Sequence, residues 1–439
     1  MSLAANQAWT CDALSSAGFA SPGTYTYWAD WLDSNGNWHR GELGPEKTFT
    51  LQTTAPIVQV AAPSSPPPLA AGSSVTVAAP VAPGAYTVPA GATVVSTSAQ
   101  LINALAGTAK NIVLADGTYD SASPFRDTNS TGLYAQHPGK AVLTAGLVVG
   151  GNFSTGGAVV RGLSFDISDP TKVFQSAEIQ NWGNGGYNTQ VLDCTFEGHG
   201  VIPVGLRATN VSGLVAQRLV FSHFTDEGIR ASENATVPYG TATPTIDTIS
   251  DISVDGVSRS TPGSSSGTAE AGLWIGHPVT NGVRRIRIRN VSSTGIETVS
   301  NSWDTTFSDL DIDMSGPNQV RGVGVYMEHF TLGDTFTNFL ITGAMTGFNA
   351  EWNDNIAGNA AAHNVTITNG TIDATGSTAV RTAGVYLDEG TDSTTITNVT
   401  FKNQNWAGIG AFRIIGNNVF SGNTFQLGPG AVQISPGHI

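Results

Sequence analysis

The sequence predicts an all-β protein that folds as a solenoid, and three observations predict it. A short unit that begins with glycine recurs along the chain from about residue 143. A second unit, out of phase with the first, places one polar residue between two apolar segments. The composition agrees, because only 12% of the 439 residues are charged and 52 are glycine. About a quarter of residues are charged in an average domain, and Gly, Thr, Asn and Val are poor helix formers.

The glycine-led unit reads Gly–apolar–x–apolar–x–x. Its glycines are Gly205, Gly228, Gly272, Gly295, Gly324, Gly347, Gly384 and Gly408. The steps between them are 23, 44, 23, 29, 23, 37 and 24 residues. The shortest steps are close to 23 residues, which indicates a repeating coil of about that length. The longer steps indicate coils that carry loop insertions. Repetition at this period is typical of a solenoid, and the β-type side chains exclude the helical kinds.

The second unit reads apolar–x–polar–apolar–x–apolar, as in Val191–Phe196 and Ile396–Phe401. Its polar position holds Asp193, Arg218, Asp251, Arg285, Asp309, Asn338, Asn369 and Asn398. Asn and Asp tolerate the left-handed conformation, so this position fits a tight bend between two strands. Each coil then holds three short strands: one before the bend, one after it, and the glycine-led strand. We therefore predict a single-stranded right-handed parallel β-helix of about ten coils, in which a helix over residues 99–105 caps the N-terminal end.

Three regions follow from the local sequence. Residues 1–60 contain apolar–polar alternations around an Asn-Gly turn, which predict a partial β-sandwich with strands like those of immunoglobulin or fibronectin domains. Residues 61–87 form a Pro/Ala/Ser-rich linker, and residues 88–439 form the β-helix. The two cysteines, Cys11 and Cys194, are too few for a disulfide framework and are predicted to be reduced thiols.

Residues 88–435 resemble the pectate-lyase-like superfamily of right-handed parallel β-helices. The resemblance rests on the cap helix followed by Ile112–Tyr119, on the ladder of polar bends and on the glycine-led strands. It implies a protein that acts on polysaccharides, because many members are lyases, hydrolases or epimerases of acidic or neutral polysaccharides. Other members are phage tailspikes and adhesins, and the fold does not choose among these functions.

Carboxylates stack on the glycine-led strands. Equivalent positions on successive coils lie ~4.8 Å apart, and the third and fifth residues of each unit point outward. The fifth position places Glu328, Glu351 and Asp388 on consecutive coils. Like charges side by side are unfavourable, so this stack indicates a site that holds a cation or shares protons. We interpret Glu328 or Glu351 as the general acid and Asp388 as the base that activates water, with Glu297 as a fourth candidate.

Aromatic and basic side chains flank these carboxylates. The predicted substrate-binding residues are Trp274, His277, Tyr326, His329, Trp352, Tyr386 and Arg230. Carboxylates beside aromatic rings suit a glycan, so we expect a glycoside hydrolase with its cleft on the glycine-led sheet. The composition favours a secreted protein. We expect a monomer or small homo-oligomer that requires no cofactor, although Ca²⁺ is possible. A net charge of −14 argues against a nucleic-acid partner, and no apolar run reaches the ~18 residues of a membrane span.

Two alternatives remain open. A lyase acting on a uronic-acid polymer would use Arg207 and Arg230 to neutralise the uronate, with Ca²⁺ as an optional bridging cation. One weakness is that the arginines lie about four coils, or ~20 Å, from the stacked carboxylates. Another is that Arg207 and Arg230 have possible ion-pair partners nearby in Asp226, Glu227 and Glu233. The other alternative is a non-catalytic, glycan-binding or adhesive β-solenoid.

Overall fold

The computed structural model describes residues 75–127, 130–150, 157–172, 175–180, 188–232, 244–257, 270–299, 301–316, 322–328, 331–350, 362–414 and 416–436, and the backbone of four strands before residue 52. The chain divides into two compact units, residues 1–71 and 72–439. In the first unit β1 (Gly23–Tyr27) pairs antiparallel with β4 (Lys47–Leu51), and β2 (Trp31–Leu32) pairs with β3 (Trp38–His39). In the sequence, β2 and β3 lie on either side of the Asn-Gly pair that predicted a turn.

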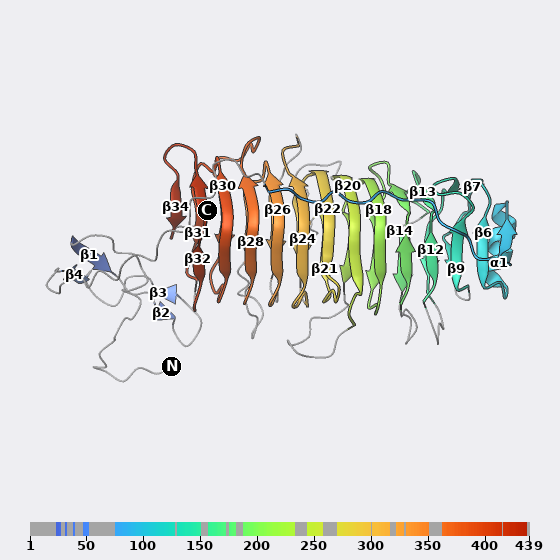
Figure 1. Cartoon of the computed structure of the whole chain (residues 1–439), viewed down its shortest axis with the longest axis horizontal. Helices are drawn as coiled ribbons and strands as arrows, with labels where there is room; N and C mark the ends of the chain where they lie inside the picture. Colours follow the sequence, from blue (N-terminus) through green and yellow to red (C-terminus); the bar gives the residue numbers. More distant parts are fainter. Residues whose placement is uncertain are drawn as a thin grey trace. The chain divides into compact units, whose positions relative to one another are not determined.

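The second unit is a right-handed parallel β-helix, as predicted (Figure 1). One sheet, here called the Gly-led sheet, contains twelve strands in the described residues, compared with the predicted ten or so coils. They are β8 (Phe125–Asp127), β11 (Leu147–Val149), β14 (Gln175–Gln180), β17 (Val204–Thr209), β19 (Glu227–Ser232), β21 (Ala271–Gly276), β23 (Thr294–Thr298), β25 (Val323–Met327), β27 (Thr346–Ala350), β29 (Ala383–Leu387), β31 (Ala407–Ala411) and β34 (Val432–Ser435). Each strand pairs in parallel with its equivalent on the next coil, which makes the coil the repeating unit.

The other sheet, here called the bend sheet, carries the polar bends. Its strands before the middle of the chain are β5 (Thr93–Val95), β6 (Asn111–Leu114), β7 (Gly117–Tyr119), β9 (Gly132–Ala135), β10 (Ala141–Leu143), β12 (Val159–Arg161), β13 (Ser164–Asp166), β15 (Gln190–Leu192) and β16 (Thr195–Glu197). The later ones are β18 (Val215–Phe224), β20 (Thr248–Val257), β22 (Val283–Val291), β24 (Thr306–Asp313), β26 (Thr335–Thr342), β28 (Thr366–Asp373), β30 (Thr395–Lys402), β32 (Val419–Ser421) and β33 (Thr424–Gln426).

All eight predicted bend residues have a left-handed backbone, with φ between 52° and 59°. The expected pair of strands around each bend is separate at β12 and β13, at β15 and β16, and at β32 and β33. In the coils between β18 and β30 the two segments instead form one long strand. The ladder there skips the bend residue and resumes on its far side, as Ser250–Arg284 and Ile252–Ile286 show. A single left-handed residue therefore redirects the strand without ending it.

The leading glycines are required by a close approach between coils. A Cβ atom on Gly295 would lie 2.5 Å from the carbonyl oxygen of Gly324, and one on Gly347 would lie 2.5 Å from that of Gly384. The same contact recurs from coil to coil along the Gly-led sheet. A Cβ atom does not fit into the gap on these coils, so the glycine repeat there is a steric consequence of coil stacking.

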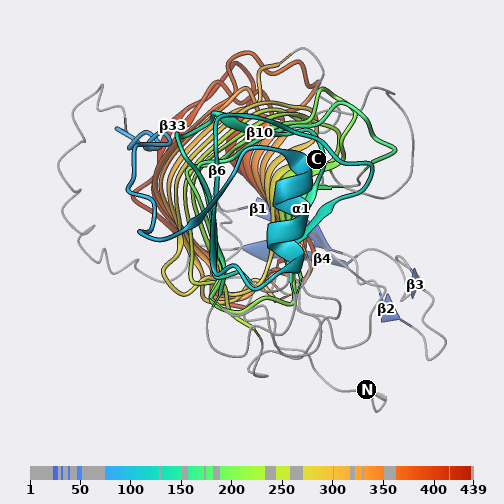
Figure 2. The ribbon, with the colours of Figure 1, turned by 90° about the vertical axis from the view of Figure 1, so that its right-hand side faces the viewer.

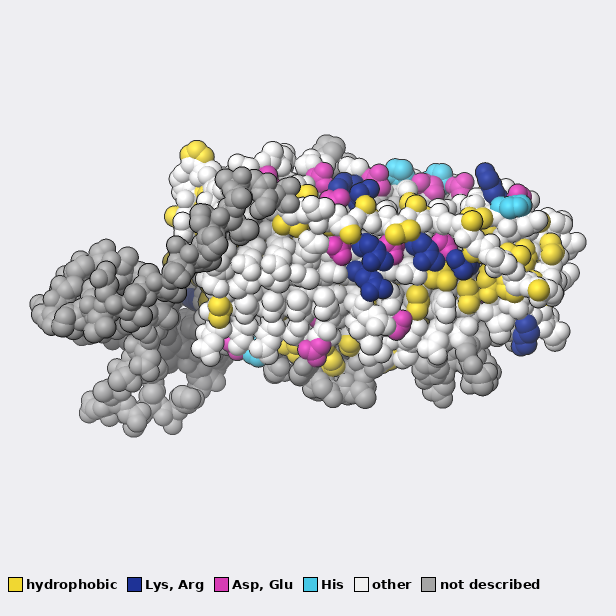
Figure 3. Space-filling model, in the orientation of Figure 1, with side chains coloured by type: hydrophobic (Ala, Val, Ile, Leu, Met, Phe, Trp, Pro, Cys, Tyr) yellow, Lys and Arg dark blue, Asp and Glu magenta, His cyan; other side chains and the backbone are white. Residues whose placement is uncertain are grey.

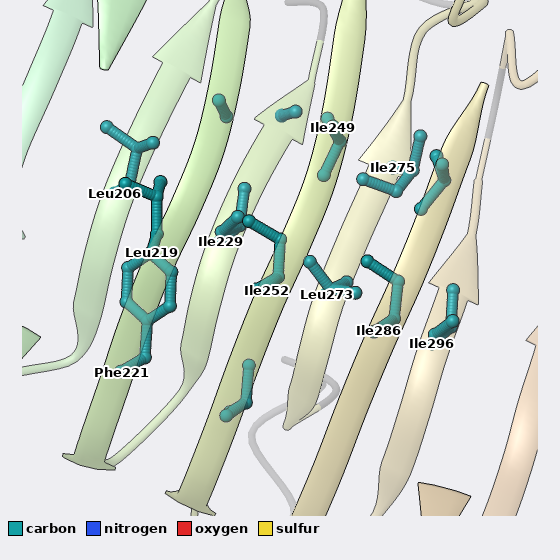
Figure 4. Packing of buried hydrophobic residues seen from close by; sticks show 14 of the residues in the cluster. Leu206, Leu219, Phe221, Ile229, Ile249, Ile252, Leu273, Ile275, Ile286 and Ile296 are labelled. Carbon is teal, nitrogen blue, oxygen red and sulfur yellow. The ribbon is translucent and has the colours of Figure 1, made fainter. Parts of the chain in front are cut away.

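The core lies between the two sheets. Leu206, Ile229 and Leu273 of the Gly-led sheet face Leu219 and Ile252 of the bend sheet (Figure 4), and all five are fully buried. The predicted cap is α1 (Ser98–Ala106), which covers the N-terminal end of the β-helix (Figure 2). It buries Leu101 and Leu105, and its N-cap Thr97 accepts a hydrogen bond from the Gln100 N–H.

Cys194 is a free thiol in this core, as predicted, and burial raises its pKa to about 12. Cys11 lies outside the described residues. No helix in the described part of the chain has the length and apolar character that crossing a bilayer requires.

The later half of the predicted linker belongs to the β-helix unit. Residues 75–86, here called the strap, run along the bend ladder (Figure 1, thin blue trace). The strap N–H groups of Ala78, Val81 and Gly84 donate to Oδ1 of Asp309, Asp251 and Asp193, at 3.5, 3.0 and 3.1 Å. Three residues of extended polyproline-like chain advance about 9.3 Å, and two coils advance about 9.6 Å. The strap therefore meets every second bend of the ladder.

Candidate functional site

The outer face of the Gly-led sheet carries one column of positions, mostly with large polar or aromatic side chains, here called the central column. Its members are Glu178, Arg207, Arg230, Trp274, Glu297, Tyr326, Asn349, Tyr386 and Gly410, each in register with the next. The neighbouring residues along each strand are buried in the core, so the column faces outward. The predicted third-position stack is thus present in the structure.

The predicted carboxylate stack lies one step beyond the strand ends. Glu328 and Asp388 are both partly exposed and directly follow β25 and β29. The Glu328 N–H donates to the Thr298 carbonyl at 2.9 Å, and the Asp388 N–H donates to the Ala350 carbonyl at 3.1 Å. These bonds extend the ladder by one residue. One coil, that of β27, separates the two carboxylates, which corresponds to about 9.6 Å along the axis.

Three predicted site residues, Glu351, His329 and Trp352, lie outside the described residues. The middle member of the carboxylate stack therefore stays a prediction.

Four other predicted site residues are in the expected place but almost fully buried. Glu297, Tyr326 and Tyr386 in the central column are only 3%, 6% and 3% exposed. His277 is completely buried, and its Nδ1 lies 3.2 Å from the carbonyl oxygen of Pro244. The two tyrosines were expected to offer open rings for sugar stacking, and in this structure they offer no such surface.

Arg230 and Trp274 form the best-defined contact in the central column. The Arg230 guanidinium lies over the Trp274 ring, 3.5 Å from its centre, a cation–π contact. The Nη1 atom of Arg230 is 3.3 Å from Oε1 of Glu227, a carboxylate that is completely buried. Burial lowers the pKa of Arg230, the Glu227 carboxylate opposes this effect, and Arg207 adds to it. Arg230 is thus held on two sides.

Arg207 lies beside Arg230 on the preceding coil. Its side chain is partly buried and makes no ion pair or hydrogen bond with any described residue. Nε of Arg207, Nε of Arg230 and Nε1 of Trp274 are three buried donors without an acceptor in the described part of the chain. Buried donors without acceptors are costly, so three of them on consecutive coils call for a physical explanation.

Two buried carboxylates on this face lie outside the predicted site residues, Glu178 and Glu227. The pairing of Arg230 with Glu227 confirms one of the ion pairs expected from the sequence, whereas Glu178 was not predicted. Glu178 accepts a hydrogen bond from the Gln175 side chain and precedes Arg207 in the central column. Its coil was hidden because Ser176 stands at the position of the leading glycine. Glu227 directly precedes Gly228, a position that the repeat pattern left unassigned.

A hollow of about 600 Å³ on the bend sheet brings histidines and carboxylates together without indicating a site. Its polar groups belong to a second ladder of bends, in which a carboxylate bonds to a left-handed residue of the next coil. The pairs are Asp166 with His199, Glu197 with His223, Asp255 with Asn290 and Asp373 with Asn403. Asparagine fills the same role as histidine, so these contacts are structural. Among the described residues no group of three or more His, Cys, Asp and Glu side chains could hold a metal ion.

The sequence matches no family model and no curated protein. Solved structures with low identity do match. An alginate lyase from Paenibacillus sp. str. FPU-7 is 13% identical, with a TM-score of 0.32 over 79% of this chain and 97% of that one. The catalytic domain of a GH87 alpha-1,3-glucanase, solved with tetrasaccharides, is 14% identical, with a TM-score of 0.45 over 81% and 60%. A surface adhesin of Streptococcus pneumoniae is 10% identical, with a TM-score of 0.40 over 77% and 87%. These neighbours include polysaccharide hydrolases and lyases, and the similarity concerns the fold alone.

Proposed function

We propose that this protein is a glycoside hydrolase that binds a polysaccharide on the outer face of the Gly-led sheet and cleaves it with Glu328 and Asp388. The supporting observation is that two partly exposed carboxylates occupy equivalent ladder positions with one coil between them. The resulting separation of about 9.6 Å is at the wide end of the range for inverting hydrolases, which must fit a water molecule between base and sugar.

In this proposal Glu328 is the general acid and Asp388 the general base. Glu328 gives its proton to the glycosidic oxygen as the bond from that oxygen to the anomeric carbon breaks. Asp388 takes a proton from the water that attacks the anomeric carbon from the opposite face. The product has an inverted anomeric centre and one new reducing end. We further propose that the protein is secreted, since its low charge and its Gly, Thr and Asn content are typical of extracellular solenoids.

A lyase acting on a uronic-acid polymer is the second candidate, and one observation favours it. Arg207 makes no ion pair or hydrogen bond with any described residue, although it lies next to Arg230. The distance of the arginines from the stacked carboxylates is an objection to the lyase only if Glu328 and Asp388 take part in the lyase reaction. Glu178, Glu227 and Glu297 place carboxylates on the coils of the arginines or on a nearby coil. A lyase site could therefore be assembled around Trp274.

The test is a panel of neutral and acidic polysaccharides, assayed for new reducing ends and for the ultraviolet absorbance of unsaturated sugar products. Wild type is compared with Glu328→Gln and Asp388→Asn, and with Glu389→Gln as a matched control. Glu389 adjoins Asp388 and makes an ion pair with Arg413 at 3.2 Å. We expect reducing ends without absorbance, a loss of at least 100-fold in both test variants, and little change in the control.

Other outcomes would discriminate the alternatives. Unsaturated products would show that the protein is a lyase and not a hydrolase, whether or not a chelator lowers the activity. Full activity in both carboxylate variants would remove Glu328 and Asp388 from the mechanism. Binding of a polysaccharide without cleavage of any polymer in the panel would identify an adhesive solenoid.

A further inference from the structure

We propose that Arg207 and Arg230 form a carboxylate-binding subsite, so that the glycan bound on the Gly-led sheet is an acidic polysaccharide. This inference rests on the proposed function only in placing a glycan on this face. It does not depend on which residues break the glycosidic bond.

The first argument is the pairing of like charges. Arg207 and Arg230 are direct neighbours across β17 and β19. Like charges at directly opposite positions of a sheet destabilise it. An arginine pair that is partly withdrawn from water is therefore unfavourable unless an anion lies against it. One neighbour, Arg230, has Glu227, whereas Arg207 has no carboxylate partner among the described residues.

The second argument is a comparison with the bend sheet. There Arg218 and Arg285 of the bend ladder, and Arg161 beside it, pair with carboxylates of an adjoining coil: Arg161 and Arg218 with Asp193, and Arg285 with Asp251. Arg284 is the exception on that sheet, since its buried Nε has no acceptor among the described residues. Figure 3 shows dark blue and magenta side chains lying close together on one face of the β-helix. The β-helix can supply a partner to a stacked arginine, and among the described residues it supplies none to Arg207.

The third argument is the set of unsatisfied donors. Nε of Arg207, Nε of Arg230 and Nε1 of Trp274 are buried N–H groups on three consecutive coils. A ligand carboxylate offers two acceptor oxygens and a negative charge, which match the planar fork of a guanidinium. A neutral sugar hydroxyl could accept one hydrogen bond but would leave Arg207 without an ion pair, since its neighbour Glu178 on the preceding coil makes none with it.

The fourth argument is that one half of the subsite is already rigid. Glu227 and Trp274 hold the Arg230 guanidinium at 3.3 and 3.5 Å from two directions. A side chain that is fixed before binding loses little entropy when a ligand arrives. Trp274 thus acts by orienting Arg230, since its ring face is covered by the guanidinium and is not free to stack on a sugar.

The test measures binding of polygalacturonate and alginate, and of the same two polymers after their carboxyl groups have been reduced to alcohols. Wild type should bind at least one acidic polymer about tenfold or more tightly than its reduced form, with a loss of affinity at high salt. Arg207→Ala should remove this preference. Arg207→Lys keeps the charge and bulk without the Nε donor, so it should bind with intermediate affinity even if Arg207→Ala fails to fold.

Arg287→Ala is the matched control, because it removes one positive charge on the bend sheet, where Arg287 pairs with Asp311 at 3.3 Å. It should bind acidic polymers as wild type does. Equal binding of acidic and reduced polymers, no binding of either acidic polymer, or an unchanged preference in both Arg207 variants would overturn the subsite.

The subsite proposal and the hydrolase proposal can be disproved by different results. Glu328→Gln and Asp388→Asn should keep the preference for the acidic polymer, because neither residue belongs to the subsite. If both variants still cleave while Arg207→Ala loses the preference, the hydrolase is wrong and the subsite stands. If the preference is absent while both carboxylate variants are inactive, the hydrolase stands and the subsite is wrong.

Discussion

Arg285 occupies the bend position one coil after Asp251, and its Nε and Nη2 atoms donate to the two carboxylate oxygens of Asp251 at 2.5 and 2.7 Å. Both residues have a left-handed backbone, with φ of 54° and 59°. Arginine rarely adopts this conformation, and here the bidentate pair stabilises it. The bend ladder is therefore held by charge pairing as well as by backbone geometry.

Replacing Arg285 by alanine should destabilise the β-helix by roughly 2–4 kcal/mol, because it leaves the buried carboxylate of Asp251 without its main partner. Denaturant unfolding at neutral pH measures this loss. Arg287→Ala, which breaks a more exposed pair, should cost less than about 1 kcal/mol. Equal losses in the two variants would contradict the role given to the bend pair.

The same pair predicts acid sensitivity. Burial alone would raise the pKa of Asp251, but hydrogen bonds from Arg285 and from the Val81 N–H outweigh it and lower the pKa below its ordinary value. The Asp251 carboxylate contributes its full stabilisation of the folded state at pH values above its pKa in the unfolded chain, about 3.9. This stabilisation is lost as the pH falls through the lower pKa that Asp251 has in the folded state. Unfolding between pH 5 and pH 2 should show a smaller loss in Arg285→Ala than in wild type.

Asp334 should have the opposite pH dependence. It is fully buried, and burial raises its pKa to about 7 although Ser302 Oγ and the Thr305 N–H donate to it at 2.7 and 2.8 Å. The folded state then holds a proton that the unfolded state releases near pH 4, so its contribution to stability falls as the pH rises from about 4 to 7. Asp334→Asn should flatten this dependence. Asn418 accepts from the Thr394 N–H at 2.9 Å in the same way, so asparagine suits such a position.

The strap should stabilise the β-helix through its N–H groups. Val81→Pro deletes the donor to Asp251, while proline keeps the chain extended. We expect a lower midpoint of thermal unfolding and faster proteolysis between residues 75 and 86. Ala82→Pro is the control, because Ala82 is not one of the three donors in the strap and precedes a proline already. Identical behaviour of the two variants would show that the strap bond contributes nothing.

The leading glycine can be tested directly. Gly295→Ala would place a Cβ atom 2.5 Å from the Gly324 carbonyl, so the coils must separate locally. We expect a loss of about 1–3 kcal/mol or more in denaturant unfolding. Gly84→Ala has no atom within 4 Å of its new Cβ and keeps its N–H, so its stability should remain close to that of wild type. A neutral Gly295→Ala would contradict the steric account of the repeat.

The repeat itself made much of the fold predictable. A fixed period determines which residues stack, so the left-handed bends and the register of the central column followed from spacing, as Asn398 and Tyr386 illustrate. Contacts between outward side chains do not follow from spacing. The stacking of Arg230 on Trp274, and the burial of Tyr326 and Tyr386, depend on side-chain conformations that a repeat leaves open.

The strap was hidden for a different reason. Its bonds use backbone N–H groups, which every residue except proline carries, so nothing in the side chains of Ala78, Val81 and Gly84 distinguishes them from a free linker. Only the acceptors, the aspartates of the bend ladder, have a sequence signature.

The two-coil pitch of the strap restricts how the β-helix can change in length. Between Asp193 and Asp309 the bends alternate between aspartate, which accepts a strap N–H, and arginine, which cannot. Inserting or deleting a single coil in this stretch would set Arg218 or Arg285 against a strap donor and leave an aspartate without one. Coils can be gained or lost there only in twos, so the strap imposes an even-number rule on this part of the molecule.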